Sequence, residues 1–424
     1  MKLKLALFLA RCSLWHRRRV LALVCLTLTL SVTLLLGIQY LRTEVKQSFT
    51  NTISDTDLII GARSGQINQL LYTVFHIGNA TNNIRWSTFQ QLEEDPRISW
   101  LIPISLGDSY RGYRVVATDK RMLDHFRYGQ GSPLELARGR WFDKVFDVVL
   151  GAGVARGLGH SPGDRIVLSH GGGKTSFSNH EQTPFTVIGI LSPTGTPVDQ
   201  AVYISLDGME AMHVGWSSGV AIPGRTLTPE KADGLSFTPD AITAAFAGLD
   251  QKILTFRVQR EINQSTLEPL SAILPGVALS ELWRLMGQFE RALLGITGFV
   301  VITSLIGLIA VLLTLQAQRA HEIAVLRAIG ASPSLIAVLY VIECVALAVV
   351  ACMFAVILGA LAIATLSPWM LASYGLHIPL RPLNSFEWAL LASIPATAFA
   401  VALIPAFSAW RQSRAMGLGD TGEK

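Results

Sequence analysis

Four apolar runs, each long enough to cross a lipid bilayer, constrain the fold of this 424-residue chain more than any other feature. An α-helix rises about 1.5 Å per residue, so about 20 apolar residues cross the ~30 Å of hydrocarbon in a membrane. Half of the residues are hydrophobic and only 15% are charged, which is too apolar for an average soluble protein. The predicted spans are residues 20–40, 291–316, 335–366 and 388–407.

The first run is predicted to remain as a span and not to be removed as a signal peptide. It holds about 19 apolar residues and continues into Gln39 without a small-residue cleavage site. Residues 1–19 mix apolar and basic side chains, which predicts a helix that lies on the membrane surface.

The basic residues predict the orientation. Residues 1–19 hold six Lys and Arg, the loop 317–334 holds two and the tail 408–424 holds three, whereas the loop 367–387 holds only Arg381. By the positive-inside rule both termini and the loop 317–334 are cytoplasmic, and residues 41–290 lie outside. The cytoplasmic pieces carry eleven basic against three acidic residues, so the net charge of +5 reflects topology and predicts no nucleic-acid partner.

Residues 41–290 are numerous enough for a domain of two lobes. Helix and strand patterns alternate over 41–133, and short strands and turns follow, which predicts an α/β lobe at 41–133 and 250–290 with a β-rich lobe at 134–249 inserted into it. Residues 252–259 are predicted to form a strand, and the chain from there to Leu282 a helix. The four cysteines lie in or beside the spans, so the external domain is not expected to contain disulfides.

The loop 317–334 has the pattern of a short helix with a sharp end. Ile323, Leu326 and Ile329 recur at helical spacing, and Gly330 suits the left-handed position that ends a helix. Ser332 and Pro333 then supply an N-cap and a first-turn proline for the next helix. Because a span lies on each side, a force on this short helix would move both.

The same residues resemble the MacB/FtsX-type permease subunits of the ABC transporter superfamily, which carry R-x-x-E-I-x-x-L-R-A-x-G-A between their second and third spans. In that family the segment is a coupling helix that docks into a groove on a cytoplasmic ATPase, which implies that role for matching residues here. The external phrases VVLGAGVARGLG, PGDRIVL and FTVIGIL, and Asp199 with AVYISL, are also similar to that family. The predicted ATPase-coupling residues are Arg319, Glu322, Ile323, Leu326, Arg327 and Gly330.

Other candidate sites are weaker. Residues 171–175, GGGKT, resemble the end of a P-loop, but Leu168 stands where the motif requires glycine and a loop pattern follows. We therefore expect no bound cofactor, with ATP and Mg²⁺ held by a partner chain. His160, His170 and His180 are ten residues apart, a spacing without ligand geometry, so solvated loop histidines and no metal are predicted. No G-x-S-x-G elbow appears on a predicted strand-to-helix turn, so the sequence does not indicate a hydrolase.

Polar and small residues within the spans carry a separate expectation. Glu343 lies about eight residues into the third predicted span and should face protein, water or headgroups, because an ionised carboxylate in lipid is costly. Gly295, Gly298 and Gly307 are expected to allow close helix packing, within the chain or across a dimer.

The sequence as a whole predicts an α-helical membrane protein with four spans and a two-lobed α/β external domain between the first and second. The resemblance implies a non-enzymatic permease of the bacterial inner membrane that works as a dimer, with itself or a related subunit, and with a cytoplasmic ABC ATPase. ATP hydrolysis would drive periplasmic movements that export, extract or release a substrate. An FtsX-like transmitter that activates a periplasmic enzyme, a membrane-anchored sensor and a periplasmic enzyme are the alternatives.

Overall fold

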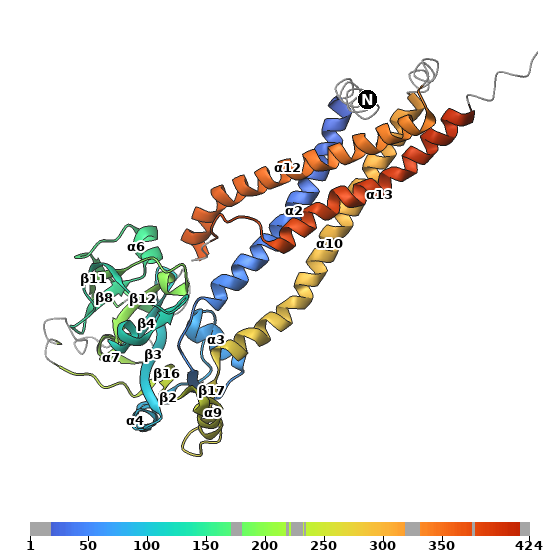
Figure 1. Ribbon diagram of the computed structural model, residues 1–424. Helices are drawn as coiled ribbons and strands as arrows, with labels where there is room; N and C mark the ends of the chain where they lie inside the picture. Colours follow the sequence, from blue (N-terminus) through green and yellow to red (C-terminus); the bar gives the residue numbers. More distant parts are fainter. Residues whose placement is uncertain are drawn as a thin grey trace, which may run out of the picture. The chain divides into compact units, whose positions relative to one another are not determined.

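The computed structural model describes residues 18–170, 180–217, 220–221, 232, 235–318, 331–374 and 378–415 (Figure 1). By internal contacts the chain divides into two units. The membrane unit comprises Met1–Glu44, Gly287–Leu366 and Pro379–Lys424, and the external unit comprises Val45–Met286 and Ser367–Ile378.

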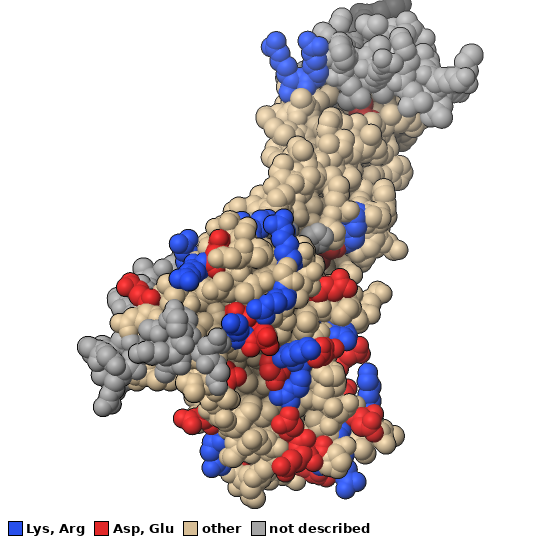
Figure 2. All heavy atoms as spheres, turned by 90° about the vertical axis from the view of Figure 1, so that its left-hand side faces the viewer, with Lys and Arg blue, Asp and Glu red and all other residues tan. Residues whose placement is uncertain are grey.

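Four described helices are long and apolar enough to cross a membrane, as predicted. They extend beyond the predicted spans because an apolar run marks only the part of a helix that meets hydrocarbon. Figure 2 shows the helical surface on one face as almost free of charged side chains. The helices are α2 (Arg18–Thr50), α10 (Pro275–Gln318), α12 (Pro333–Tyr374) and α13 (Ser385–Ala415).

Small residues allow close packing in the membrane unit. Ala348 and Ala355 on α12 and Ala398 on α13 belong to one buried apolar cluster, and their short side chains let helix backbones approach. The Cys344 thiol lies 3.6 Å from the carbonyl oxygen of Ala398. A hydrogen bond of 2.8 Å between the hydroxyls of Ser31 and Ser304 joins α2 to α10.

The external unit is built on one mixed sheet, eleven-stranded in the described part of the chain. Most neighbours are antiparallel, but β4 and β12 pair in parallel, as do β8 and β11. The shorter β9 (Arg165–Ile166) pairs with β11, and β10 (Ser169–His170) pairs with β3. The main order is β17 (Leu270–Ile273), β1 (Leu58–Ala62), β16 (Ala244–Leu249), β3 (Ile98–Tyr110), β4 (Tyr113–Thr118), β12 (Ala201–Ser205), β8 (Asp147–Leu150), β11 (Phe185–Leu191) and β7 (Leu136–Gly139).

Both faces of this sheet are covered. Along β1, Leu58 and Ile60 pack in one apolar cluster and Ile59 packs in the other, because successive side chains of a strand point to opposite faces. Burial on both sides explains why the central strands are continuous apolar runs without alternation. The covering helices include α3 (Gln66–Val74), α4 (Trp86–Glu93), α5 (Arg121–His125), α6 (Ala152–Leu158), α7 (Leu206–His213) and α9 (Thr255–Asn263).

Three sequence expectations are wrong in detail. Residues 252–259, predicted as a strand, form a 3-10 turn at Lys252–Leu254 and the start of α9, where Val258 is buried and Phe256 is exposed. The helix predicted after it is interrupted by strand β17. Strand β16, assigned to the β-rich lobe, pairs with β1 and β3 of the first lobe. The last two errors concern short strands whose conformation is decided by their partners in the sheet, whereas residues 252–259 turn one apolar face inward as a helix and leave Phe256 exposed.

Candidate functional site

The predicted coupling residues Arg319, Glu322, Ile323, Leu326, Arg327 and Gly330 lie outside the described residues. The structure shows what flanks them: α10 ends at Gln318 and α12 begins at Pro333. The backbone N–H of Leu335 donates to the Ser332 hydroxyl at 3.3 Å, so Ser332 caps α12 and Pro333 occupies its first turn, as predicted. The segment therefore connects two membrane-length helices directly.

Glu343 faces protein, as its position in the span predicts. Only 3% of the residue is exposed, on the part of α12 that also contributes Cys344 to the buried cluster of the membrane unit.

The glycines of α10 were expected to allow close helix packing either within the chain or across a dimer, and the first of these two expectations is not met. A Cβ added at Gly295, Gly298 or Gly307 would meet nothing within 4 Å, so no other described part of the chain packs closely against these residues.

An ion cluster that the sequence reasoning missed joins two helices of the membrane unit. The guanidinium of Arg381, just before α13, donates two hydrogen bonds of 2.9 Å to the Glu387 carboxylate and one of 2.5 Å to Glu44 at the end of α2. It also lies 4.5 Å from the centre of the Tyr40 ring. Both carboxylates are buried: the side chain of Glu44 is 5% exposed and that of Glu387 is 0% exposed. Arg381 is thus a link between α2 and α13, besides its contribution to the charge asymmetry.

Backbone contacts fix this cluster further. The Tyr40 hydroxyl donates to the carbonyl of Pro379 at 2.6 Å and accepts from the N–H of Arg381 at 3.0 Å. Asn384 and Glu387 form a reciprocal capping box, each side chain accepting from the backbone N–H of the other at 2.8 Å. The Glu387 bonds raise the pKa of Arg381, so the guanidinium stays charged. Of this cluster, only the Asn-x-x-Glu pattern of the capping box could have been recognised in the sequence, because Glu44 lies far from it along the chain.

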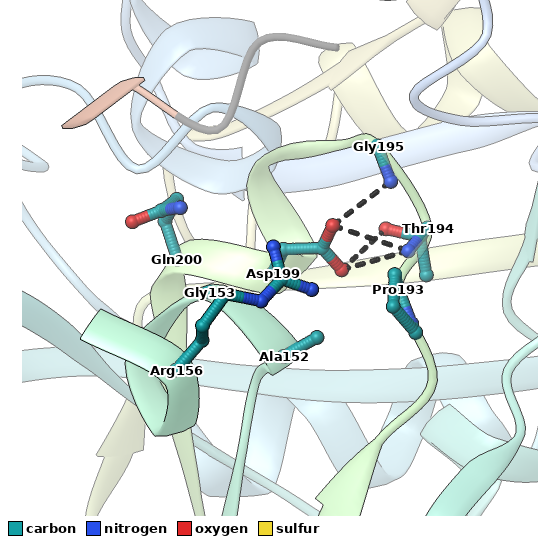
Figure 3. Close-up of a pocket in the computed structure, with 8 residues that line it drawn as sticks. All are labelled: Ala152, Gly153, Arg156, Pro193, Thr194, Gly195, Asp199 and Gln200. Atoms are coloured by element: carbon teal, nitrogen blue, oxygen red, sulfur yellow. Dashed lines mark hydrogen bonds between the residues drawn. The ribbon is translucent and has the colours of Figure 1, made fainter. Parts of the chain in front are cut away.

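In the external unit, a pocket of about 210 Å³ lies beside the buried carboxylate of Asp199. Figure 3 shows that carboxylate facing the turn at Thr194 and Gly195, with Arg156 reaching into the same pocket. It accepts from the Thr194 hydroxyl at 2.9 Å and from the Gly195 N–H at 2.8 Å. Burial raises the pKa of Asp199. With its oxygens engaged in a turn, Asp199 holds structure and is not placed as a catalytic acid.

The glycine-rich phrase before α6 packs against this turn. A Cβ at Gly151 would lie 2.5 Å from the carbonyl oxygens of Val198 and Asp199, and one at Gly153 would lie 2.8 Å from the latter. Glycine is therefore required at both positions for the start of α6 to approach the backbone. Two sequence phrases that lie about 45 residues apart are joined in a single packing unit.

Comparisons with known families cover most of the chain. Residues 21–233 match the MacB-like periplasmic core domain, and residues 294–418 match the FtsX-like permease C-terminal domain. The chain belongs to the MacB/FtsX family of ABC transporter permeases. No curated protein matches it. The candidate spans and the periplasmic-type domain of this MacB/FtsX permease are those of a bacterial inner-membrane protein.

Two solved structures are similar to part of this MacB/FtsX permease. The periplasmic region of MacB from Actinobacillus actinomycetemcomitans has 12% identity and a TM-score of 0.32, covering 55% of this chain and 94% of that one. The extracellular domain of the noncanonic ABC-type transporter YknZ from Gram-positive bacteria has 12% identity and a TM-score of 0.28, covering 51% and 99%.

The external histidines of this permease are not solvated loop residues, which corrects the expectation from sequence. His160 is largely buried and contacts the Asp164 carboxylate at 3.0 Å and the Tyr110 hydroxyl at 2.9 Å. His180 is 1% exposed, and His170 is partly buried. His170 and His180 lie together, whereas His160 belongs to a separate group. Residues 171–175, the P-loop-like stretch, lie outside the described part of the chain.

Proposed function

We propose that this MacB/FtsX permease couples ATP hydrolysis by a separate cytoplasmic ABC ATPase to movements of its external unit. The two family matches carry the proposal, because together they cover most of the external domain and the spans that flank the predicted coupling helix. Closure of the ATPase pair would push the segment 319–330, and α10 and α12 would carry the displacement. The chain itself would not be catalytic, and two copies, or one with a related subunit, would form the membrane part.

The ATP-driven movements of this permease would act on a substrate or partner outside the membrane. The buried carboxylates of Glu44 and Glu387 and the partly buried Arg381 are engaged in contacts between helices. This arrangement suits a bundle that transmits force more than one that lines a polar path. The described pocket beside Asp199 belongs to the external unit. The proposed substrate or partner is accordingly periplasmic, either a molecule to be exported or released or a protein to be activated.

The test combines charge reversal with reconstitution. The permease is purified from its host together with the ATPase that associates with it, and placed in lipid nanodiscs. ATP turnover and hydrogen exchange of residues 45–286, with and without ATP, are then measured. The double variant Glu322→Lys/Arg327→Glu should insert normally and lose the ATP-dependent change in exchange while basal ATP turnover continues.

A control variant separates coupling from general charge effects. Arg284→Glu disrupts an exposed pair with Glu281 in α10, far from the predicted coupling residues in sequence, and should leave the response to ATP unchanged. If no ATPase co-purifies, or if the double variant responds to ATP as the wild type does, the proposed coupling is wrong. C-terminal reporter fusions that prove active only in the periplasm would contradict the proposed orientation.

A further inference from the structure

Four potential metal ligands converge in the external unit. Asp108 lies in β3, His170 in β10, His180 ten residues later and His213 at the end of α7. One ligand atom from each lies within 4.8 Å of every other. The sheet produces this grouping, because β10 pairs with β3 in a register that sets His170 opposite Asp108. The N–H of His180 donates to the carbonyl of Leu168 at 2.9 Å, which brings it to the same place.

The carboxylate of Asp108 is buried in an unusual way. Its residue is 1% exposed, yet neither oxygen receives a hydrogen bond of ordinary geometry from the described residues. His170 Nδ1 and His213 Nε2 lie 2.8 Å and 3.4 Å from its two oxygens. At these distances the imidazole nitrogens and the carboxylate oxygens face one another closely, as ligand atoms around a common ion do. A buried carboxylate without such bonds is costly unless a cation compensates it.

The tautomer of His213 strengthens this point. Its Nδ1 lies 2.7 Å from the carbonyl oxygen of Met209, and a carbonyl can only accept, so Nδ1 carries a hydrogen. In the neutral ring Nε2 then presents a lone pair toward the Asp108 carboxylate. Two acceptors facing one another are stabilised by a cation between them. A histidine that binds a metal through one ring nitrogen usually donates the N–H of its other ring nitrogen to a group such as a backbone carbonyl, which fixes the ring.

His180 completes the set. It is 1% exposed, and neither ring nitrogen makes a hydrogen bond of ordinary geometry within the part of the chain that the structure describes. The Trp216 ring lies 4.2 Å from that of His180 and 5.2 Å from that of His170, giving the group an aromatic wall.

We propose that Asp108, His170, His180 and His213 bind one divalent transition-metal ion, with Zn²⁺ as the best fit. Three imidazoles and one carboxylate suit Zn²⁺, which takes four nitrogen, sulfur or oxygen ligands in tetrahedral geometry. Ca²⁺ and Mg²⁺ are poor candidates because they prefer all-oxygen sites. Four protein ligands also favour a closed, structural site over a catalytic one with an open position.

The proposed ion would cross-link parts of the chain that lie far apart. Asp108 and His213 are separated by more than 100 residues, and His170 and His180 flank the segment 171–179. Binding would therefore hold β3, β10 and the end of α7 together and fix both ends of that segment. The stability of the external unit should then depend on metal, because an ion that binds only the folded state stabilises it.

The test uses the full chain in detergent, purified through an affinity tag without histidines and stripped with a chelator. Co²⁺ is added as a spectroscopic substitute, and one equivalent should give the intense visible absorption of a tetrahedral centre, which one equivalent of Zn²⁺ then abolishes. Asp108→Asn keeps the shape of the side chain, and His213→Ala removes a partly exposed ligand. Each should weaken Zn²⁺ binding by about 100-fold or more, since loss of an outer-shell partner alone costs up to that.

His160→Ala is the matched control, because His160 lies in the same unit but bonds to Asp164 and Tyr110. It should bind Co²⁺ and Zn²⁺ as the wild type does. Zn²⁺ should raise the thermal midpoint of the wild type and of His160→Ala, and leave that of Asp108→Asn unchanged. If Asp108→Asn does not fold, His213→Ala decides the result. Absence of a stoichiometric tetrahedral Co²⁺ spectrum in the wild type, or its retention in His213→Ala, would overturn the proposal.

Discussion

Replacement of Arg381 by glutamine should destabilise the membrane unit strongly. The guanidinium is 22% exposed, whereas the side chains of Glu44 and Glu387 are 5% and 0% exposed. Without Arg381, two carboxylates remain buried at the junction of α2 and α13, and no other described residue forms an ion pair with them. The Tyr40 ring also loses the cation that lies against it.

The magnitude follows from the cost of breaking a buried pair, which is about 3–5 kcal/mol. Because Arg381 retains some contact with solvent, we expect the lower end, about 3 kcal/mol, or roughly a 150-fold change in the folded-to-unfolded ratio. Arg42→Gln is the control, since Arg42 pairs with Glu290 at 2.6 Å but is 37% exposed. Solvent screening should limit that loss to less than about 1 kcal/mol.

The assay is unfolding of the purified chain in detergent by heat and by denaturant. The measured quantity is the fraction of protein that remains monodisperse. Arg381→Lys should recover part of the loss, because an ammonium cannot make the paired hydrogen bonds of a guanidinium. The double variant Arg381→Gln/Glu387→Gln should be more stable than Arg381→Gln, since it removes one uncompensated charge. Equal losses in Arg381→Gln and Arg42→Gln would refute this reasoning.

Three further predictions concern single side chains. Gly151→Ala should cost the external unit about 1–3 kcal/mol in denaturant unfolding, because its Cβ meets backbone oxygens, whereas Gly107→Ala, with open space around it, should be near neutral. Burial, and to a lesser degree the positive charge of Arg114, lowers the pKa of His76 from 6.5 to about 4. The unfolded chain therefore binds the extra proton between these values, so stability should fall as pH falls from 6.5 to 4, and His76→Asn should flatten that decline in pH-dependent melting. Ser31→Ala should cost about 0.6 kcal/mol in the same detergent assay through loss of its interhelical hydrogen bond, and a larger loss would indicate a role beyond that bond.

Fold class was predictable because membrane helices and buried strands follow from local patterns. The four apolar runs gave the helices, since hydrocarbon requires about 20 apolar residues in each. Ser332 and Pro333 gave the start of α12, because capping involves neighbours in the chain. The positions of β16 and β17 were not predictable in this way, since a short apolar segment becomes a strand only where a partner offers its edge.

Local pattern also explains which site residues were found. The burial of Glu343 followed from its place in an apolar run, because the cost of a charge in lipid does not depend on the partner. The link from Arg381 to Glu44 did not follow, since it needs two helices whose ends meet across more than 300 residues of sequence. Gly295 illustrates the opposite kind of error. A glycine in a span indicates that another helix could pack closely there, but it does not show whether one does.

The sequence by itself determined the four spans, their charge asymmetry and the family, because hydropathy, charge and short motifs are properties of neighbouring residues. Only the tertiary structure decided that His170 and His180 lie beside Asp108 and His213 while His160 does not, and that Asp199 holds a turn against Gly151. Sheet pairing brings such residues within a few ångströms, and register depends on the whole fold and not on the spacing between residues along the chain.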